Sequence, residues 1–176
     1  MRDLGDPFDQ LRSSHRRLEE RLDELGEAAR KLAAGGPEAN EAREIVDGLC
    51  GWFARSVGRH EEDEERSLFP RLKDEAALAP ILASLTAEHR EHEQLHAKLR
   101  SAEPAALPAI ADALLAAYRK HIDEEERALF PAAERLLDDE ARRAMIEEME
   151  SRRGRGGGQG GGGGGSNRGG GRGRME

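Results

Sequence analysis

Apolar residues recur at steps of three and four positions along four long segments of the chain, residues 8–32, 46–68, 82–99 and 107–129. This spacing places one apolar stripe along each of four amphipathic helices. The connections between the segments are short, so consecutive helices are expected to run antiparallel. The pattern therefore predicts an all-α protein built as an antiparallel up-down-up-down four-helix bundle.

Prolines mark the expected ends and breaks of these helices. Asp6-Pro7 is typical of a helix start, with an acidic N-cap before proline at the first helical position. Pro70 is expected to end or kink the second helix near Lys73, and Pro131 to interrupt the fourth at a matching place. A short amphipathic fifth helix is predicted from Asp139 to about Glu150.

Charge divides the chain into two parts. The 176 residues carry a formal net charge of −8, but residues 1–150 alone carry −13 and residues 151–176 carry +5. An acidic body argues against a nucleic-acid-binding fold and suits a cation as ligand. We therefore expect one domain, the bundle with its fifth helix, over residues 1–150, followed by a separate tail.

The tail, residues 151–176, holds six of the arginines and 14 of the 21 glycines and has no apolar periodicity. Such a segment is expected to be disordered. Its arginines leave open a weak contact with RNA or another anionic partner, although a passive solubilising or tethering role is favoured. No other nucleic-acid binding is expected.

Three further features bear on where the protein works. Its single cysteine, Cys50, excludes an internal disulfide, and its first residues do not resemble a signal peptide. No run of 18 apolar residues is present, so no membrane span is expected. Together these features predict a soluble, cytoplasmic protein.

The sequence contains an internal repeat. The segment from His60 to Pro70, HEEDEERSLFP, recurs 61 residues later as HIDEEERALFP, from His121 to Pro131. In the same way Leu11-x3-His15 matches Leu85-x3-His89, 74 residues further on. The predicted bundle therefore consists of two related helical hairpins that face each other.

Six polar side chains fall on the apolar stripes at one level of this bundle. At about 1.5 Å per residue, four histidines each lie roughly 12–15 Å from the same bundle end. Two glutamates follow two of these histidines by four residues, hence on the same helix face. The six residues are His15, His60, Glu64, His89, His121 and Glu125.

This layer predicts a metal centre. Burying two unpaired carboxylates costs several kcal/mol each, which is large against a total stability of about 5–15 kcal/mol. Protonated histidines would offset part of this, but a pair of cations satisfies all six groups more completely. Six ligands are too many for one tetrahedral zinc, and imidazole with carboxylate suits iron or manganese. We therefore expect two iron ions bridged by carboxylates, with manganese or zinc less favoured.

With the flanking segments Leu68-Phe69-Pro70 and Leu129-Phe130-Pro131, these six residues resemble the hemerythrin-like (HHE cation-binding) domain family over about residues 7–150. The resemblance implies a four-helix bundle with a non-haem diiron centre, terminal histidine ligands and two bridging glutamates. Oxygen-carrying hemerythrins have a second histidine at the place of Glu93 and an aspartate at the place of Glu126. Glu125, which matches Glu64 in the internal repeat, is favoured as ligand, with Glu126 as the alternative. The pattern is therefore closer to the four-His, two-Glu members.

Other residues near the layer have more than one interpretation. His92 and His96 continue the stripe of the third helix. They could support the metal ligands, but the favoured interpretation is that both are neutral core histidines. Tyr118 is expected to be a core residue with its hydroxyl hydrogen-bonded. A run of acidic residues is expected to form a solvated face: Glu61, Glu62, Asp63, Glu65, Asp123, Glu124 and Glu126.

Three functions remain open at this stage. The favoured one is a diiron protein that binds dioxygen, peroxide, nitric oxide or a related small molecule as a sensor, store or scavenger. The second is an enzyme that decomposes peroxide or reduces nitric oxide at open metal positions. The third is a metal-stabilised structural or adaptor bundle. The sequence decides neither whether the protein is an enzyme nor whether it forms oligomers.

Overall fold

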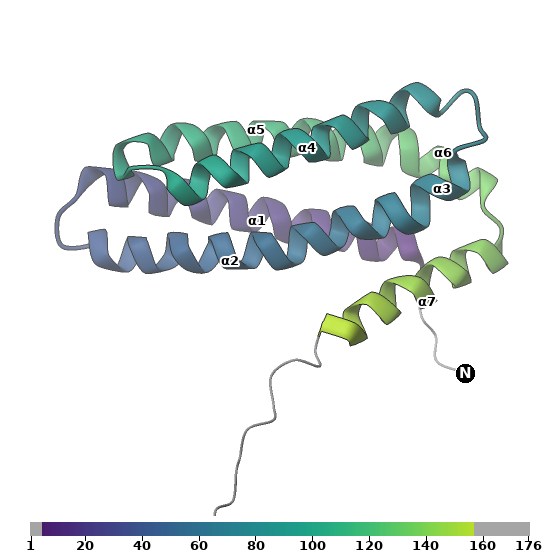
Figure 1. Ribbon diagram of the computed structural model, residues 1–176, viewed down its shortest axis with the longest axis horizontal. Coiled ribbons are helices and arrows are strands. Elements are labelled where there is room, and N and C mark those ends of the chain that lie inside the picture. Colours follow the sequence, from purple (N-terminus) through teal and green to yellow (C-terminus); the bar gives the residue numbers. More distant parts are fainter. Residues whose placement is uncertain (1–4, 157–176) are drawn as a thin grey trace, which may run out of the picture.

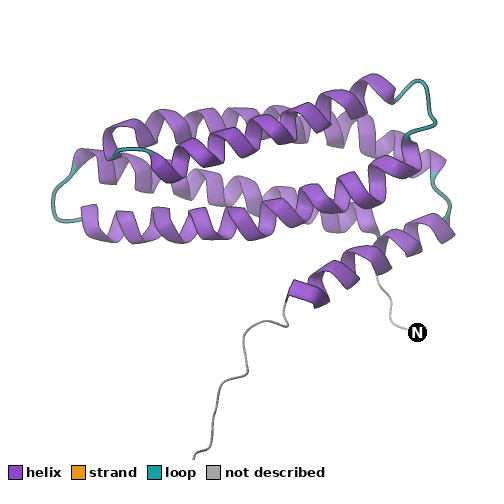
Figure 2. Ribbon diagram, viewed as in Figure 1, coloured by secondary structure: helices purple, strands orange, loops and turns teal. Residues whose placement is uncertain are grey.

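The computed structural model describes residues 5–156, and every regular element in that range is helical (Figure 2). The elements are α1 (Pro7–Ala34), α2 (Ala39–Asp63), the π-helical turn η1 (Glu64–Leu68), α3 (Phe69–Leu72), α4 (Ala79–Ser101), the 3-10 turn η2 (Pro104–Ala106), α5 (Leu107–Glu124), the π-helical turn η3 (Glu125–Leu129), α6 (Phe130–Leu136) and α7 (Asp139–Gly156). Because η1 joins α2 to α3 and η3 joins α5 to α6 without a break, these segments form two continuous rods.

Four long rods lie side by side in alternating directions (Figure 1). α1 packs against α2 and α5, and α4 packs against α5 and α2. α7 crosses the bundle near the end where α3 and α6 lie, and it contacts α1, α2 and η1. The predicted all-helical bundle is thus confirmed for the described residues.

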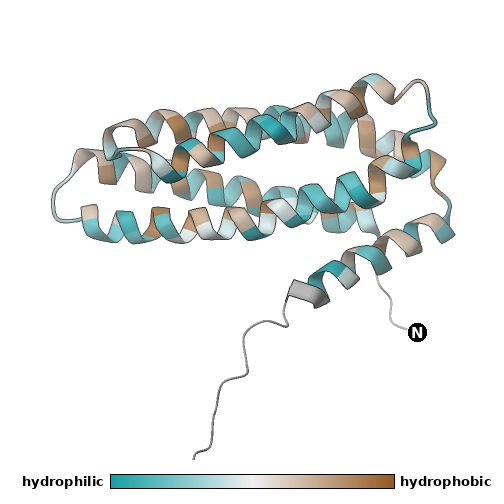
Figure 3. Cartoon of the chain, in the orientation of Figure 1, coloured by the Kyte–Doolittle hydropathy of each residue, from teal (hydrophilic) through white to brown (hydrophobic). Residues whose placement is uncertain are grey.

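Each rod buries apolar side chains. Apolar and polar residues alternate along the helices (Figure 3). The buried apolar residues form two clusters. One surrounds Leu22, Phe53 and Leu114, and the other surrounds Phe8, Leu72 and the methionines of α7. The buried histidines and glutamates belong to neither cluster.

Local signals at the start and end of α1 agree with its sequence. The Asp6 side chain accepts a hydrogen bond of 2.8 Å from the Phe8 N–H, and Pro7 occupies the first turn. Gly35 and Gly36 end the helix with φ values of 71° and 88°, a conformation that glycine adopts at little cost.

The prediction that Pro131 interrupts the fourth helix is wrong. The helical backbone continues through Pro131 to Leu136, whereas the rod that contains Pro70 ends at Leu72, close to where the sequence predicted. A π-helical turn precedes each proline, so that a residue without an N–H is accommodated inside a continuous helix. The two turns begin at Glu64 and Glu125.

The fifth helix is longer than predicted. α7 continues to Gly156, so residues 151–156, which were assigned to the disordered tail, are helical. The reason is tertiary: Nε of Arg152 lies 2.6 Å from Oδ1 of the buried Asp63, and Arg153 lies 3.6 Å from the same carboxylate. The rest of the predicted tail lies outside the described residues. Within them, no helix is both long and apolar enough to cross a membrane.

Candidate metal centre

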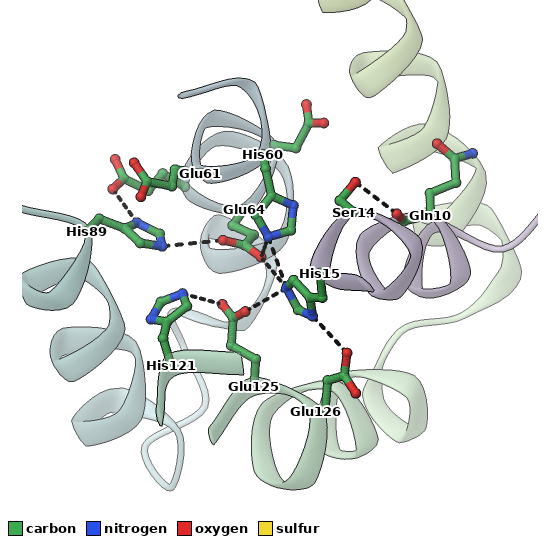
Figure 4. Close-up of polar contacts among 12 residues, drawn as sticks. Gln10, Ser14, His15, His60, Glu61, Glu64, His89, His121, Glu125 and Glu126 are labelled. Atoms are coloured by element: carbon green, nitrogen blue, oxygen red, sulfur yellow. Dashed lines mark hydrogen bonds and ion pairs between the residues drawn. The ribbon is translucent and has the colours of Figure 1, made fainter. Parts of the chain in front are cut away.

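The six residues of the predicted layer meet inside the bundle (Figure 4). They come from every rod: His15 from α1, His60 from α2, His89 from α4 and His121 from α5, with the two glutamates at the starts of η1 and η3. All six are buried, and both glutamates are 0% exposed. Side chains separated by up to 110 positions are thus brought to one point, as the counting along the helices predicted.

These residues form two overlapping groups of four. His15 and His60 gather with both glutamates on one side, and His89 and His121 gather with the same two glutamates on the other. Within each group the nitrogen and oxygen atoms all lie within 4.8 Å of one another. Glu64 and Glu125 are the members that the two groups share.

Each glutamate offers one carboxylate oxygen to each group. Oε1 of Glu64 lies 3.1 Å from Nε2 of His60, and its Oε2 lies 3.3 Å from Nε2 of His89. Oε1 of Glu125 lies 3.3 Å from Nε2 of His121, and its Oε2 lies 3.1 Å from Nε2 of His15. This is the arrangement that two bridging carboxylates require.

The donor atoms fit a pair of cations better than they fit one another. All four carboxylate oxygens of Glu64 and Glu125, and Nε2 of His89, are buried without a hydrogen-bond partner among the described residues. Native proteins rarely leave buried polar atoms in this state. Imidazole nitrogens and carboxylate oxygens without thiolates are donors that suit iron, manganese or zinc.

The buried carboxylates of the centre raise the proton affinity of the histidines, the same groups that would bind a metal. Burial by itself would lower the pKa of His89, but the Glu64 carboxylate outweighs it and raises that pKa to about 9. Against the same effect of burial, Glu125 raises the pKa of both His15 and His121. Burial would raise the pKa of Glu64, yet the His60 and His89 imidazoles hold it well below its usual range.

A family model, the hemerythrin HHE cation binding domain, matches residues 6–133 of the chain. The chain belongs to this family. The match covers the first three rods and the fourth as far as Ala133, and therefore the whole centre, whereas α7 lies beyond it. Among curated proteins, no sequence matches this hemerythrin-like chain.

Three histidines of this hemerythrin-like domain donate a hydrogen bond through Nδ1 to a further carboxylate. His15 donates to Glu126 over 2.8 Å, and His89 donates to Glu65 over 2.8 Å. Glu65 and Glu126 occupy equivalent places in the internal repeat. Both were expected on a solvated face, and their side chains are indeed partly exposed, by 30% and 36%, but each also accepts from a histidine. Because Glu126 contacts the outer nitrogen of His15, Glu125 is better placed than Glu126 to face a metal.

His121 has a partner that the sequence did not reveal. Its Nδ1 donates to Oε2 of Glu88 over 2.9 Å, and the other oxygen of Glu88 contacts Lys120. Glu88 is the residue before His89, and this adjacency was the only signal for it. Asp63, also expected on the solvated face, is only 4% exposed and pairs with α7.

The repeated Leu-Phe-Pro segments place an aromatic ring against the centre. The Phe130 ring stacks on His15 with 5.6 Å between centroids and 8° between planes. Phe69 stacks in the same way on His89, at 5.9 Å and 9°. Each phenylalanine thus covers a histidine of the opposite hairpin, which orients that ring and limits access of water to it.

His92 and His96 do not join either group of four. The Tyr118 hydroxyl and Nε2 of His96 share a hydrogen bond of 2.9 Å, and burial with the nearby His92 lowers the pKa of His96 to about 4. His96 is therefore neutral at pH 7. The ring of His92 lies 4.0 Å from that of Tyr118 and 5.0 Å from that of His121, between the centre and the His96–Tyr118 pair.

Proposed function

We propose that the chain is a non-haem diiron protein that binds dioxygen or a related small molecule. His15 and His60 would hold one iron, His89 and His121 the other, and Glu64 and Glu125 would bridge the two. One observation supports this assignment best. In each glutamate, one carboxylate oxygen lies next to a histidine of one pair and the other oxygen lies next to a histidine of the other pair.

The number of donors favours a centre that can take a further ligand. Each group of four supplies two nitrogens and two oxygens. Iron that prefers six ligands would keep open positions there, whereas zinc is satisfied by four. When bound, the two irons would supply redox chemistry at which dioxygen, peroxide or nitric oxide can react.

The protein's own residues prepare the centre in two ways. Hydrogen bonds from Nδ1 of His15, His89 and His121 to carboxylates place the ring proton on that nitrogen, which leaves Nε2 free to bind a metal. The stacked Phe69 and Phe130 rings keep two of these histidines out of water. A small, uncharged molecule would therefore enter more readily than a large polar one.

Optical spectroscopy of the iron-loaded protein tests the proposal. The protein is reduced without air, and spectra are recorded before and after exposure to dioxygen, peroxide and nitric oxide. New near-ultraviolet and visible bands that reverse when the gas is removed would support a binding function. Continuous consumption of peroxide or nitric oxide would instead identify an enzyme, and an unchanged spectrum with all three would contradict the proposal.

A further inference from the structure

His60 differs from the other three histidines of the centre. Its Nε2 faces the glutamates, but its Nδ1 is buried and has no hydrogen-bond partner among residues 5–156. The side chain as a whole is only 9% exposed. Figure 4 shows this second nitrogen turned away from the glutamates and toward Ser14.

The internal repeat shows which group is missing. Glu88, the partner of His121, lies 74 positions after Ser14, the same offset that relates His15 to His89. Ser14 therefore occupies the place of Glu88 in the other hairpin. Its hydroxyl makes no hydrogen bond with Nδ1 of His60 and donates to the backbone oxygen of Gln10 instead.

The cationic partner of the missing carboxylate is still present. In the α4–α5 hairpin, Lys120 contacts the Glu88 carboxylate that accepts from His121. The residue at the place of Lys120, 61 positions earlier in the chain, is Arg59. The α1–α2 hairpin thus has the histidine and the cation but lacks the anion between them.

A cavity of about 280 Å³ lies where that anion would be. Its walls include His60, Ser14, Arg59, Arg17, Arg153 and Trp52. The volume far exceeds the roughly 30 Å³ that one water takes in the liquid. The cavity therefore has room for a small organic anion with its hydration water.

The charge of the cavity is positive. Its one acidic group, Asp63, already pairs with Arg152 and lies 3.6 Å from Arg153. Arg17 and Arg59 make no ion pair with any described residue, and each donates its Nε–H to a backbone oxygen of its own helix. Both arginines are exposed, and they line the cavity beside the buried imidazole of His60 without a counter-charge from the described residues.

We propose that this cavity binds a small carboxylate anion of the size of formate or acetate. One carboxylate oxygen accepts a hydrogen bond from the Nδ1–H of His60, and the other pairs with Arg59. The anion thus takes the place that the Glu88 side chain occupies next to His121. The inference rests on the proposed function in one respect: a metal on Nε2 leaves the ring proton of His60 on Nδ1, where it can be donated.

The bound anion would also act on the metal centre. A carboxylate on the outer nitrogen of a ligating histidine orients the ring and increases its basicity, which changes metal affinity by about 10–100-fold. An exchangeable carboxylate beside His60 would therefore tune one half of the centre according to its concentration, while the carboxylates beside the other three histidines are part of the chain.

Fluorescence of Trp52, the only tryptophan of the chain, measures occupancy of the cavity without relying on any activity. Sodium acetate is titrated against sodium chloride at constant ionic strength, with metal-free and with metal-loaded protein. We expect a saturable change with acetate that chloride does not produce. The double variant Arg17→Gln/Arg59→Gln should weaken acetate binding by roughly 10–100-fold. The control Arg16→Gln/Arg43→Gln, which changes the same charge on the exposed sides of α1 and α2, should not.

A second variant supplies the missing carboxylate covalently. Ser14→Glu should abolish the response of Trp52 to acetate and tighten metal binding by about tenfold or more, whereas Ser13→Glu should do neither. If acetate binding survives in both Ser14→Glu and Arg17→Gln/Arg59→Gln, the anion binds elsewhere, for example on the metal itself, and the inference is overturned. An absence of any acetate response would also overturn it.

The same data separate this inference from the proposed function. Two metals per chain without an acetate response would contradict the anion site alone. Acetate binding that depends on Arg17 and Arg59, in a protein that takes up no metal, would support the site and contradict the proposed function.

Discussion

Nε2 of His15 and Nε2 of His60 lie 2.9 Å apart, although the two residues are 45 positions apart on different helices. Two nitrogens bound at right angles to one metal, each at about 2.1 Å, are separated by about 3 Å. Without a metal the same two atoms are within hydrogen-bond distance, and one ring must then carry its proton on Nε2. A metal bound by both Nε2 atoms would replace this contact, with the ring proton of His15 on Nδ1, where it donates to Glu126.

The two glutamates proposed to bridge the metals give the sharpest mutational test of this arrangement. Glu64→Gln keeps the shape of the side chain but removes the charge that would serve both metals. We expect bound metal to fall from about two ions per chain to one or fewer, measured by elemental analysis after gel filtration. Glu62→Gln, in the same turn but paired with the exposed Arg66, is the control and should retain the full content. Equal metal content in the two variants would argue against the bridging role.

Glu88 is expected to act through His121. Glu88→Ala removes the acceptor of the Nδ1 hydrogen bond, so metal affinity should fall by about 10–100-fold. Competition with a chelator of known affinity measures the change. Glu91→Ala, on an exposed position of the same helix, should leave the affinity unaltered. A similar loss in both variants would mean that only the general acidity of α4 matters.

The metal-free and metal-loaded proteins should respond to alkaline pH in opposite directions. Burial lowers the pKa of His89, but Glu64 raises it to about 9, above the unfolded value of about 6.5. Protonated His89 therefore stabilises the metal-free fold below that unfolded value, and this contribution is lost as pH rises through about 9. Metal binding needs the neutral imidazole, so affinity should increase over the same interval.

Thermal melts and metal content at a series of pH values measure the two trends. The metal-free protein should melt at lower temperature as pH rises from about 7 to 10, while metal content at a fixed, low free-metal concentration should rise. A metal-free protein that becomes more stable over this interval would show that His89 is not protonated by its carboxylate neighbours.

The contact between α7 and the bundle predicts an effect on the stability of the metal-free protein. The Arg152 side chain is 13% exposed and the Asp63 side chain 5%, so Arg152→Met leaves a buried carboxylate with only the longer contact to Arg153. We expect a loss of about 1–3 kcal/mol, measured by chemical denaturation of the metal-free protein. Arg143→Met, on the exposed side of α7, should change stability by less than about 0.5 kcal/mol.

The main features of the fold and the layer of six residues could be predicted because both follow from the spacing of residues along the sequence. Apolar spacing identifies the helices, and the distances of His15, His60, His89 and His121 from nearby prolines place them at one level. The four-residue spacing puts each glutamate on the face of its histidine. The internal repeat then selects Glu125 over Glu126, in agreement with the geometry.

Contacts that depend on how the helices are rotated against one another could not be predicted. Glu65 and Glu126 belong to an acidic run whose local pattern resembles a solvated face, and only packing shows that they reach His89 and His15. For the same reason residues 151–156 were expected to be disordered: Gly154 and Gly156 give little local support to a helix, which is stabilised here by Asp63 on another rod.

The metal content of the purified chain tests the central proposal most directly. The protein is reconstituted with ferrous iron without air, freed of unbound metal, and analysed for iron per chain together with manganese and zinc. We predict about two iron ions per chain, with manganese and zinc each well below one ion per chain. A folded protein that retains no metal, or that binds zinc alone at one ion per chain, would contradict the diiron assignment.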